Sequence, residues 1–134
     1  MELEKQVTIK KLTHEEVVNF LSGVNSYSSY WCSHWEAESD FEYRNAKQRL
    51  TQRMSEDEIC FEDVMAEVLL SGHSIILADE EEGEEYTLTI ENLKQAIGKA
   101  LEDETVSQHL VEDWDCEDCD SILQIALFGE VIYG

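Results

Sequence analysis

Two short motifs contain residues that could bind a metal ion. A C-x-x-C motif at 116–119 places two thiols within reach of one ion, and a C-x-H motif at 32–34 adds a thiol and an imidazole. Three thiolates and one imidazole form a ligand set that tetrahedral structural zinc prefers. The sequence therefore predicts a structural zinc ion. Its predicted ligands are Cys32, His34, Cys116 and Cys119, with Cys60, His73 and His109 as alternatives.

These motifs do not predict catalysis. Zinc held by four protein ligands has no open position for water or substrate. The acidic surroundings of the C-x-x-C motif would raise its thiol pKa values, which disfavours a redox role. The chain also has no P-loop, G-x-S-x-G, H-E-x-x-H or Rossmann fingerprint. We therefore expect a protein that is not an enzyme. The alternative to zinc is that the thiols are free and buried and the histidine lies at the surface.

The charge of the chain is strongly negative. Its 134 residues include 31 Asp and Glu but only 9 Lys and Arg, which gives a formal net charge of −22. Nucleic acids and anionic membranes attract basic proteins, so we expect no direct binding to either. Self-repulsion of this size in a small fold instead suggests a basic partner protein. The acids would then imitate the phosphates of DNA or RNA; the alternatives are a solvated surface that aids solubility and adaptation to high salt.

The acidic residues are concentrated in two segments. Six carboxylates lie at 79–85 and six more at 112–120. We expect both segments to contact the basic partner, with the zinc ion holding the second one in place. The predicted partner-binding residues are Asp79, Glu80, Glu81, Glu82, Glu84, Glu85, Glu112, Asp113, Asp115, Glu117, Asp118 and Asp120.

The chain is long enough for one domain, which we expect to span residues 1–134. Apolar periodicity, capping boxes and glycines predict an α+β fold, a single compact domain with a small antiparallel sheet packed with four to five helices. The expected strand at 29–36 would place Cys32 and His34 on one face. The expected strands are 6–10, 29–36, 74–79 and 85–89, and the expected helices are 14–23, 40–54, 61–71, 90–101 and 118–128.

The sequence also suggests a compartment. The first residues carry charges where the apolar region of a signal peptide would lie, and no apolar run approaches the length that spans a bilayer. Four cysteines without an export signal suggest a reducing environment. We therefore expect a cytoplasmic protein.

Two core-like segments resemble known proteins. The segments ICFEDVMAEVLLSG at 59–72 and ILQIALFGEVIYG at 122–134 are similar to small acidic proteins of phages and prophages of Gram-positive bacteria. In that setting, the size, the acidity and the possible zinc site resemble a type II anti-CRISPR protein. This resemblance implies an inhibitor that binds a basic surface of Cas9 in the bacterial host and blocks DNA loading or target recognition. It assigns no residue to the function. The alternative is a regulatory or assembly module that binds another basic phage or host protein without inhibiting a nuclease.

Overall fold

The computed structural model describes residues 11–105 and 114–133. It confirms the predicted α+β class, with helices packed on a three-stranded antiparallel sheet. The strand expected at 6–10 lies outside the described residues. The elements are α2 (His14–Tyr27), a 3-10 turn (Ser28–Tyr30), β1 (Cys32–Ala37), α3 (Asp40–Leu50), a second 3-10 turn (Glu56–Glu58), α4 (Phe61–Leu70), β2 (Ile75–Asp79), β3 (Glu85–Leu88), α5 (Ile90–Glu102) and α6 (Cys116–Phe128).

Polar side chains cap the first turn of four helices, three of them as expected and the fourth, at Asp115, not predicted. Thr13, Ser39 and Thr89 each accept a hydrogen bond from a first-turn amide of α2, α3 and α5. Asp115 does the same for α6, accepting from the Asp118 N–H at 2.8 Å. This cap satisfies an amide that would otherwise lack a partner. It explains why α6 begins at residue 116 and not at the expected residue 118.

One predicted helix end is wrong. Gly23 does not terminate α2, which continues to Tyr27. The glycine lies instead where α2 packs against Cys116 and Cys119 of α6. A Cβ at position 23 would lie 2.7 Å from Cys119 Sγ, closer than real Cβ contacts come. A missing side chain thus allows two helices to pack.

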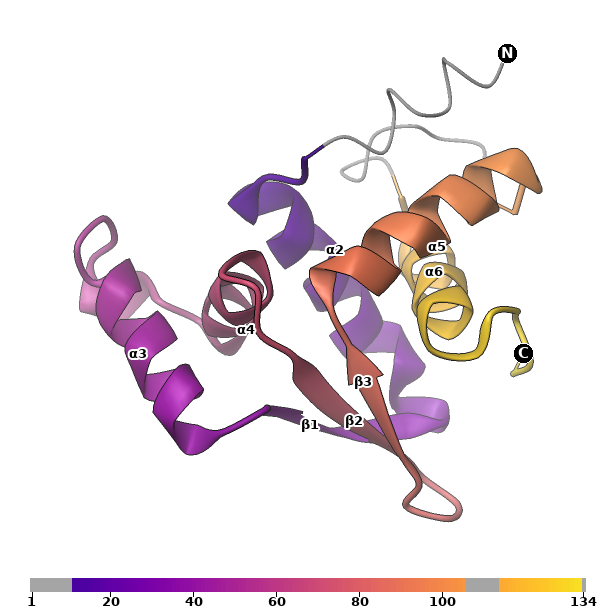
Figure 1. The fold of residues 1–134 in the computed structure, drawn as a ribbon, viewed down its shortest axis with the longest axis horizontal. Helices are drawn as coiled ribbons and strands as arrows, with labels where there is room; N and C mark the ends of the chain where they lie inside the picture. Colours follow the sequence, from indigo (N-terminus) through magenta and orange to yellow (C-terminus); the bar gives the residue numbers. More distant parts are fainter. Residues whose placement is uncertain (1–10, 106–113, 134) are drawn as a thin grey trace.

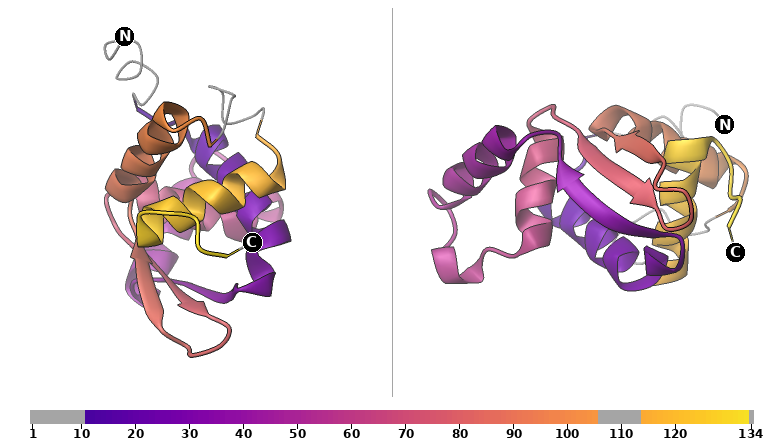
Figure 2. Two further views of the ribbon diagram at one scale, coloured as in Figure 1. Left: turned by 90° about the vertical axis from the view of Figure 1, so that its right-hand side faces the viewer. Right: turned by 90° about the horizontal axis from the view of Figure 1, so that it is seen from below.

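The sheet has the order β1-β2-β3, and the predicted β2–β3 hairpin is confirmed. Ile75 and Leu77 of β2 and Leu88 of β3 are fully buried, while Ile76, which lies between the first two, is half-buried. This alternation places one face of the sheet in the core. Figures 1 and 2 show the helices above that face, with the β2–β3 loop projecting at the end of the sheet away from α3.

Residues 31–37 differ from the expected regular strand. Ser28–Tyr30 forms a 3-10 turn, and β1 begins at Cys32 with a β-bulge between Cys32 and His34. Cys32 is opposite Asp79, whereas His34 is opposite Ala78. Because neighbouring residues of β2 point to opposite faces, Cys32 and His34 do so as well. The prediction that they share a face is wrong.

α3 is shorter than expected, and it packs on the core through the buried Ala46 and Leu50. Its apolar pattern predicts an inward Phe41, but this ring is 62% exposed. Arg49 and Arg53 both donate to the largely buried Glu67, at 2.9 and 2.7 Å. Burial alone would raise the pKa of Glu67, but the two guanidinium groups outweigh it and lower the pKa. Two of the nine basic residues, Arg49 and Arg53, therefore form ion pairs within the protein.

Candidate acidic interface

The acidic loop, which we define as residues 79–85, is shaped by its first residue. Asp79 is 8% exposed, and its Oδ1 accepts from the N–H groups of Glu82 and Gly83 at 2.7 and 3.0 Å. Gly83 has φ +68°, which glycine adopts without strain. The prediction that Asp79 contacts a partner is therefore wrong, because its carboxylate is turned inward to hold the loop.

The other acids of the loop face outward. Within the described parts of the chain, none of them forms an ion pair with a Lys, Arg or His side chain. The backbone N–H of Glu80 donates to the carbonyl oxygen of Trp31 at 2.8 Å, which fixes the loop against the start of β1. The exposed carboxylates belong to Glu80, Glu81, Glu82, Glu84 and Glu85.

The second predicted segment divides in the same way. Asp115 and Glu117 are exposed at the start of α6, and Asp118 is half-buried and completes the capping box of that helix. Asp120 is only 3% exposed. It cannot meet a partner's surface in this fold, so its predicted role in binding is wrong. Glu112 and Asp113 lie outside the described residues.

Asp120 is the centre of a buried hydrogen-bond network. Its Oδ1 accepts from Ser28 Oγ and from Trp31 Nε1, the latter at 2.8 Å. Its Oδ2 accepts from Tyr30 Oη at 2.8 Å and from Gln124 Nε2 at 2.9 Å. Burial and the adjacent Asp120 raise the pKa of Tyr30, which keeps its hydroxyl a donor. Hydrogen bonds to a charged acceptor compensate part of the desolvation of the carboxylate.

The same network holds the tail, which we define as residues 130–133. Gln124 Oε1 accepts from the N–H groups of Ile132 and Tyr133 at 2.8 and 2.7 Å. The ring of Tyr133 stacks on Trp31 with a centroid distance of 5.0 Å. Burial and the carboxylates of the acidic loop, Asp79 foremost, raise the pKa of Tyr133. Tyr133 therefore packs on Trp31, whose carbonyl oxygen accepts from the N–H of Glu80 in the acidic loop.

The predicted zinc ligands do not form a cluster. Cys32 and Cys119 are buried, and burial raises the pKa of each thiol to about 12. Cys116 is exposed, and His34 points into solvent beside Glu36 at 3.4 Å. Among residues 11–105 and 114–133, no three His, Cys, Asp or Glu side chains are placed to hold a metal ion. The four residues do not fit one shared ion in this conformation, and zinc binding stays a prediction from ligand spacing.

The alternative ligands are also separated. Cys60 is exposed at the start of α4. His73 lies between two carboxylates, 3.4 Å from Glu38 and 3.1 Å from Glu42. His109 lies outside the described residues.

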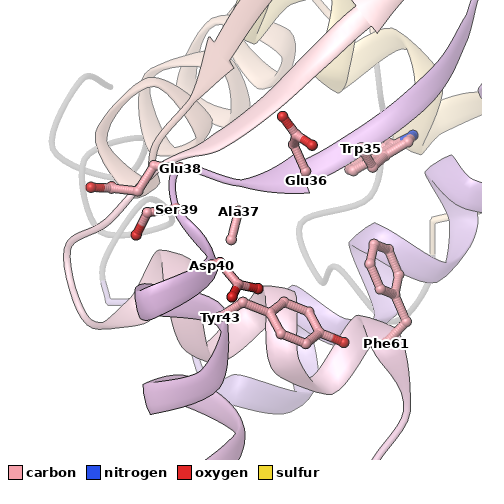
Figure 3. Close-up of a pocket in the computed structure, with 8 residues that line it drawn as sticks. All are labelled: Trp35, Glu36, Ala37, Glu38, Ser39, Asp40, Tyr43 and Phe61. Carbon is pink, nitrogen blue, oxygen red and sulfur yellow. The ribbon is translucent and has the colours of Figure 1, made fainter.

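A groove that the sequence did not predict lies between β1 and the starts of α3 and α4. It has a volume of about 310 Å³. Figure 3 shows the rings of Tyr43 and Phe61 on one side and Trp35 on the other, with Asp40 next to Tyr43. Its sequence signal is the mixture of aromatic and acidic residues at 35–43. That signal is weak, because the groove also needs Phe61 from a separate helix.

Comparison with known proteins assigns no family. No protein-family model matches the chain, and no curated protein or solved structure shows significant similarity to it. Among the described residues, no helix combines the length and the apolar character needed to cross a membrane. The functional argument therefore rests on the charges and contacts described above.

Proposed function

We propose that this protein binds a positively charged, nucleic-acid-binding surface of another protein and keeps nucleic acid from it. The observation that carries the proposal is the acidic loop, with five exposed glutamates within residues 80–85 and no ion pair among the described residues. Asp79 and the hydrogen bond from Glu80 to Trp31 hold this loop in a defined shape, which reduces the ordering cost of binding.

The density of charge in the loop suits this role. Consecutive Cα atoms are about 3.8 Å apart, and B-DNA carries one phosphate per about 3.4 Å of each strand. The loop thus offers a basic groove a row of anions of similar density. When the two surfaces meet, the partner releases its bound anions, and long-range attraction accelerates the encounter.

The distribution of the basic residues favours the loop end of the molecule. Four of the nine Lys and Arg residues lie at 44–53, on α3 and directly after it. In Figure 1, α3 and the acidic loop lie at opposite ends of the fold. These four cations offset part of the negative charge at the α3 end, which favours contact of a basic surface with the acidic loop and with Asp115 and Glu117 at the start of α6.

The resemblance to type II anti-CRISPR proteins identifies Cas9 as the proposed partner. Cas9 holds its guide–target duplex in a positively charged channel. The protein would occupy part of that basic surface and block DNA loading or target recognition. It needs no catalytic step, because steric and electrostatic exclusion of DNA is sufficient.

The test uses two variants with equal net charge. In the loop variant, Glu80, Glu81, Glu82, Glu84 and Glu85 become glutamine. In the control variant, five exposed glutamates elsewhere become glutamine: Glu15, Glu56, Glu58, Glu91 and Glu102. Affinity for purified Cas9–guide complex and inhibition of DNA cleavage are measured at about 150 mM salt, where exposed charges act over about 8 Å.

We expect the loop variant to lose affinity at least about fivefold, since exposed ion pairs contribute roughly 0.2–1 kcal/mol each and five are removed. The control variant should stay close to wild type and keep inhibiting cleavage. Equal losses in both variants would mean that only net charge matters and would contradict the proposal. Binding to Cas9 without inhibition of cleavage would instead support a non-inhibitory regulatory or assembly module.

A further inference from the structure

The groove between β1 and α3 combines aromatic surface with negative charge. Its walls include the half-buried rings of Trp35 and Tyr43 and the partly exposed ring of Phe61. Carboxylates of Glu36, Glu38 and Asp40 lie along its edge. A second groove, between α5 and α6, is smaller at about 170 Å³ and includes Lys99 but no carboxylate. Ring faces attract cations through their quadrupole, and carboxylates attract them by charge.

We propose that the groove at β1 and α3 binds the side chain of an arginine on the surface of the basic partner. A guanidinium is flat, so it can stack on a ring while its N–H groups pair with a carboxylate. An ammonium makes no such stack and gives up its hydration less readily. The inference rests on the proposed function only for the source of the arginine, the same basic partner. The recognition chemistry belongs to the groove itself.

Of the three acids of the groove, Asp40 is the one most weakly engaged within the protein, since Glu36 lies 3.4 Å from His34 and Glu38 lies 3.4 Å from His73. Asp40 lies 3.4 Å from Arg44, but both side chains are more than two-thirds exposed. Exposed pairs four residues apart on a helix stabilise by only about 0.3–0.5 kcal/mol, so an incoming guanidinium can replace Arg44 at little cost. Glu38 is held more firmly, because it accepts from the backbone N–H of Ser74 at 2.6 Å. Figure 3 shows the carboxylates of Glu38 and Glu36 directed away from the rings of Tyr43 and Phe61, which leaves Asp40 as the acceptor beside them.

The position of the groove relative to the acidic loop defines a two-point contact. β1 begins beside the acidic loop, where the N–H of Glu80 donates to the carbonyl oxygen of Trp31. It ends at Ala37, which lines the groove. Six residues of extended strand span roughly 17–20 Å. The partner should therefore carry an arginine about this far from the basic patch that meets the loop. Such a pair of anchors adds specificity to the electrostatic contact, since the arginine must enter an aromatic site of fixed geometry.

The groove can be tested without the partner. Blocked single residues, N-acetyl-arginine amide, N-acetyl-lysine amide and N-acetyl-citrulline amide, are titrated into the ¹⁵N-labelled protein. We expect the arginine probe to shift the Trp35 indole signal and the amide signals of residues 36–43 saturably. Lysine should bind at least about threefold more weakly, and uncharged citrulline weaker still. Equal binding of lysine or citrulline, or shifts confined to the acidic loop, would overturn the inference.

Matched variants separate the groove from general effects of ring removal or charge. Phe61→Ala removes a wall of the groove, whereas Phe41→Ala removes a more exposed ring that does not line it. Asp40→Asn removes a groove charge, whereas Glu91→Gln removes an exposed acid from the first turn of α5. We expect the first variant of each pair to weaken the arginine probe about threefold to tenfold, and the second to leave it unchanged.

The same variants distinguish failure of the inference from failure of the proposed function. If Phe61→Ala and Asp40→Asn leave affinity for Cas9 unchanged while the loop variant abolishes it, the arginine anchor is wrong and the acidic interface stands. If the arginine probe binds the groove and the loop variant still binds Cas9 normally, the groove stands and the acidic interface is wrong.

Discussion

Replacing Asp120 by alanine removes the acceptor of four hydrogen bonds in the interior of the protein. Tyr30 is 48% exposed, so its hydroxyl can turn to water. Gln124 Nε2 can still donate to the carbonyl oxygen of Tyr133, which lies 3.2 Å away. Ser28 Oγ and Trp31 Nε1 are buried, and Asp120 is the acceptor that the structure gives each of them. Alanine at position 120 therefore leaves two buried donors unsatisfied.

An unsatisfied buried donor costs about 1–3 kcal/mol, so two of them cost roughly 2–6 kcal/mol. Removing a desolvated carboxylate offsets part of this loss, because Asp120 forms no ion pair within the described residues. We expect Asp120→Ala to lower the free energy of unfolding by about 3 kcal/mol.

Asp120→Asn should cost less, about 1–2 kcal/mol, since its carbonyl oxygen still accepts from Ser28 and Trp31. Its new amide group faces the amide of Gln124. If the Gln124 amide rotated to present its oxygen to the asparagine at position 120, it would lose the hydrogen bonds that this oxygen accepts from the N–H groups of Ile132 and Tyr133.

Urea unfolding followed by tryptophan fluorescence and circular dichroism measures these losses. Glu117→Gln, an exposed change on the same helix, serves as the control and should stay within about 0.5 kcal/mol of wild type. The m value should stay constant in all variants, because the surface exposed on unfolding hardly changes. A loss below about 1 kcal/mol for Asp120→Ala would refute the assignment of this carboxylate as the acceptor of the buried donors.

Two further predictions concern the cysteines and the contact between α2 and α6. Gly23→Ala should destabilise the protein by about 1–3 kcal/mol, because its new Cβ would clash with Cys119 Sγ, and the better helix propensity of alanine does not offset this. In a double-mutant cycle, adding Cys119→Ala should recover part of the lost stability. A thiol reagent at pH 8 should label Cys60 and Cys116 rapidly and Cys32 and Cys119 only on unfolding, since burial raises the pKa of the last two to about 12. Preincubation with zinc that protects Cys116, with reactivity restored by EDTA, would instead show that the predicted zinc site forms.

The sequence predicted most of the fold because its signals are local. A capping side chain and a 3.6-residue period lie within one helix, so α4 and α5 could be placed almost to the residue. The β2–β3 hairpin follows from two alternating runs around a short loop. The errors arose where distant contacts decide. Gly23 continues a helix because α6 packs against it, and the bulge at Cys32 follows from pairing with Asp79.

The site was predictable in composition but not in detail. The sequence locates the acidic segments, but it cannot tell an exposed carboxylate from a buried one. The groove was missed because its walls come from β1, α3 and α4. The zinc prediction assumed that a C-x-H motif places both ligands on one face, which holds only in a regular strand, and the bulge in β1 removes that condition.

Asp79 and Asp120 show how a protein of this charge can keep an acidic loop in a fixed shape. A buried carboxylate without a cation is costly unless several donors compensate it. Each of these residues has such donors: two backbone amides at Asp79, and two hydroxyls, an indole and an amide at Asp120. These inward acids fix the acidic loop and the tail, so the outward acids can repel one another without unfolding the segment that carries them. Cations placed at the loop would neutralise the proposed interface, whereas here Arg49 and Arg53 pair with Glu67 of α4.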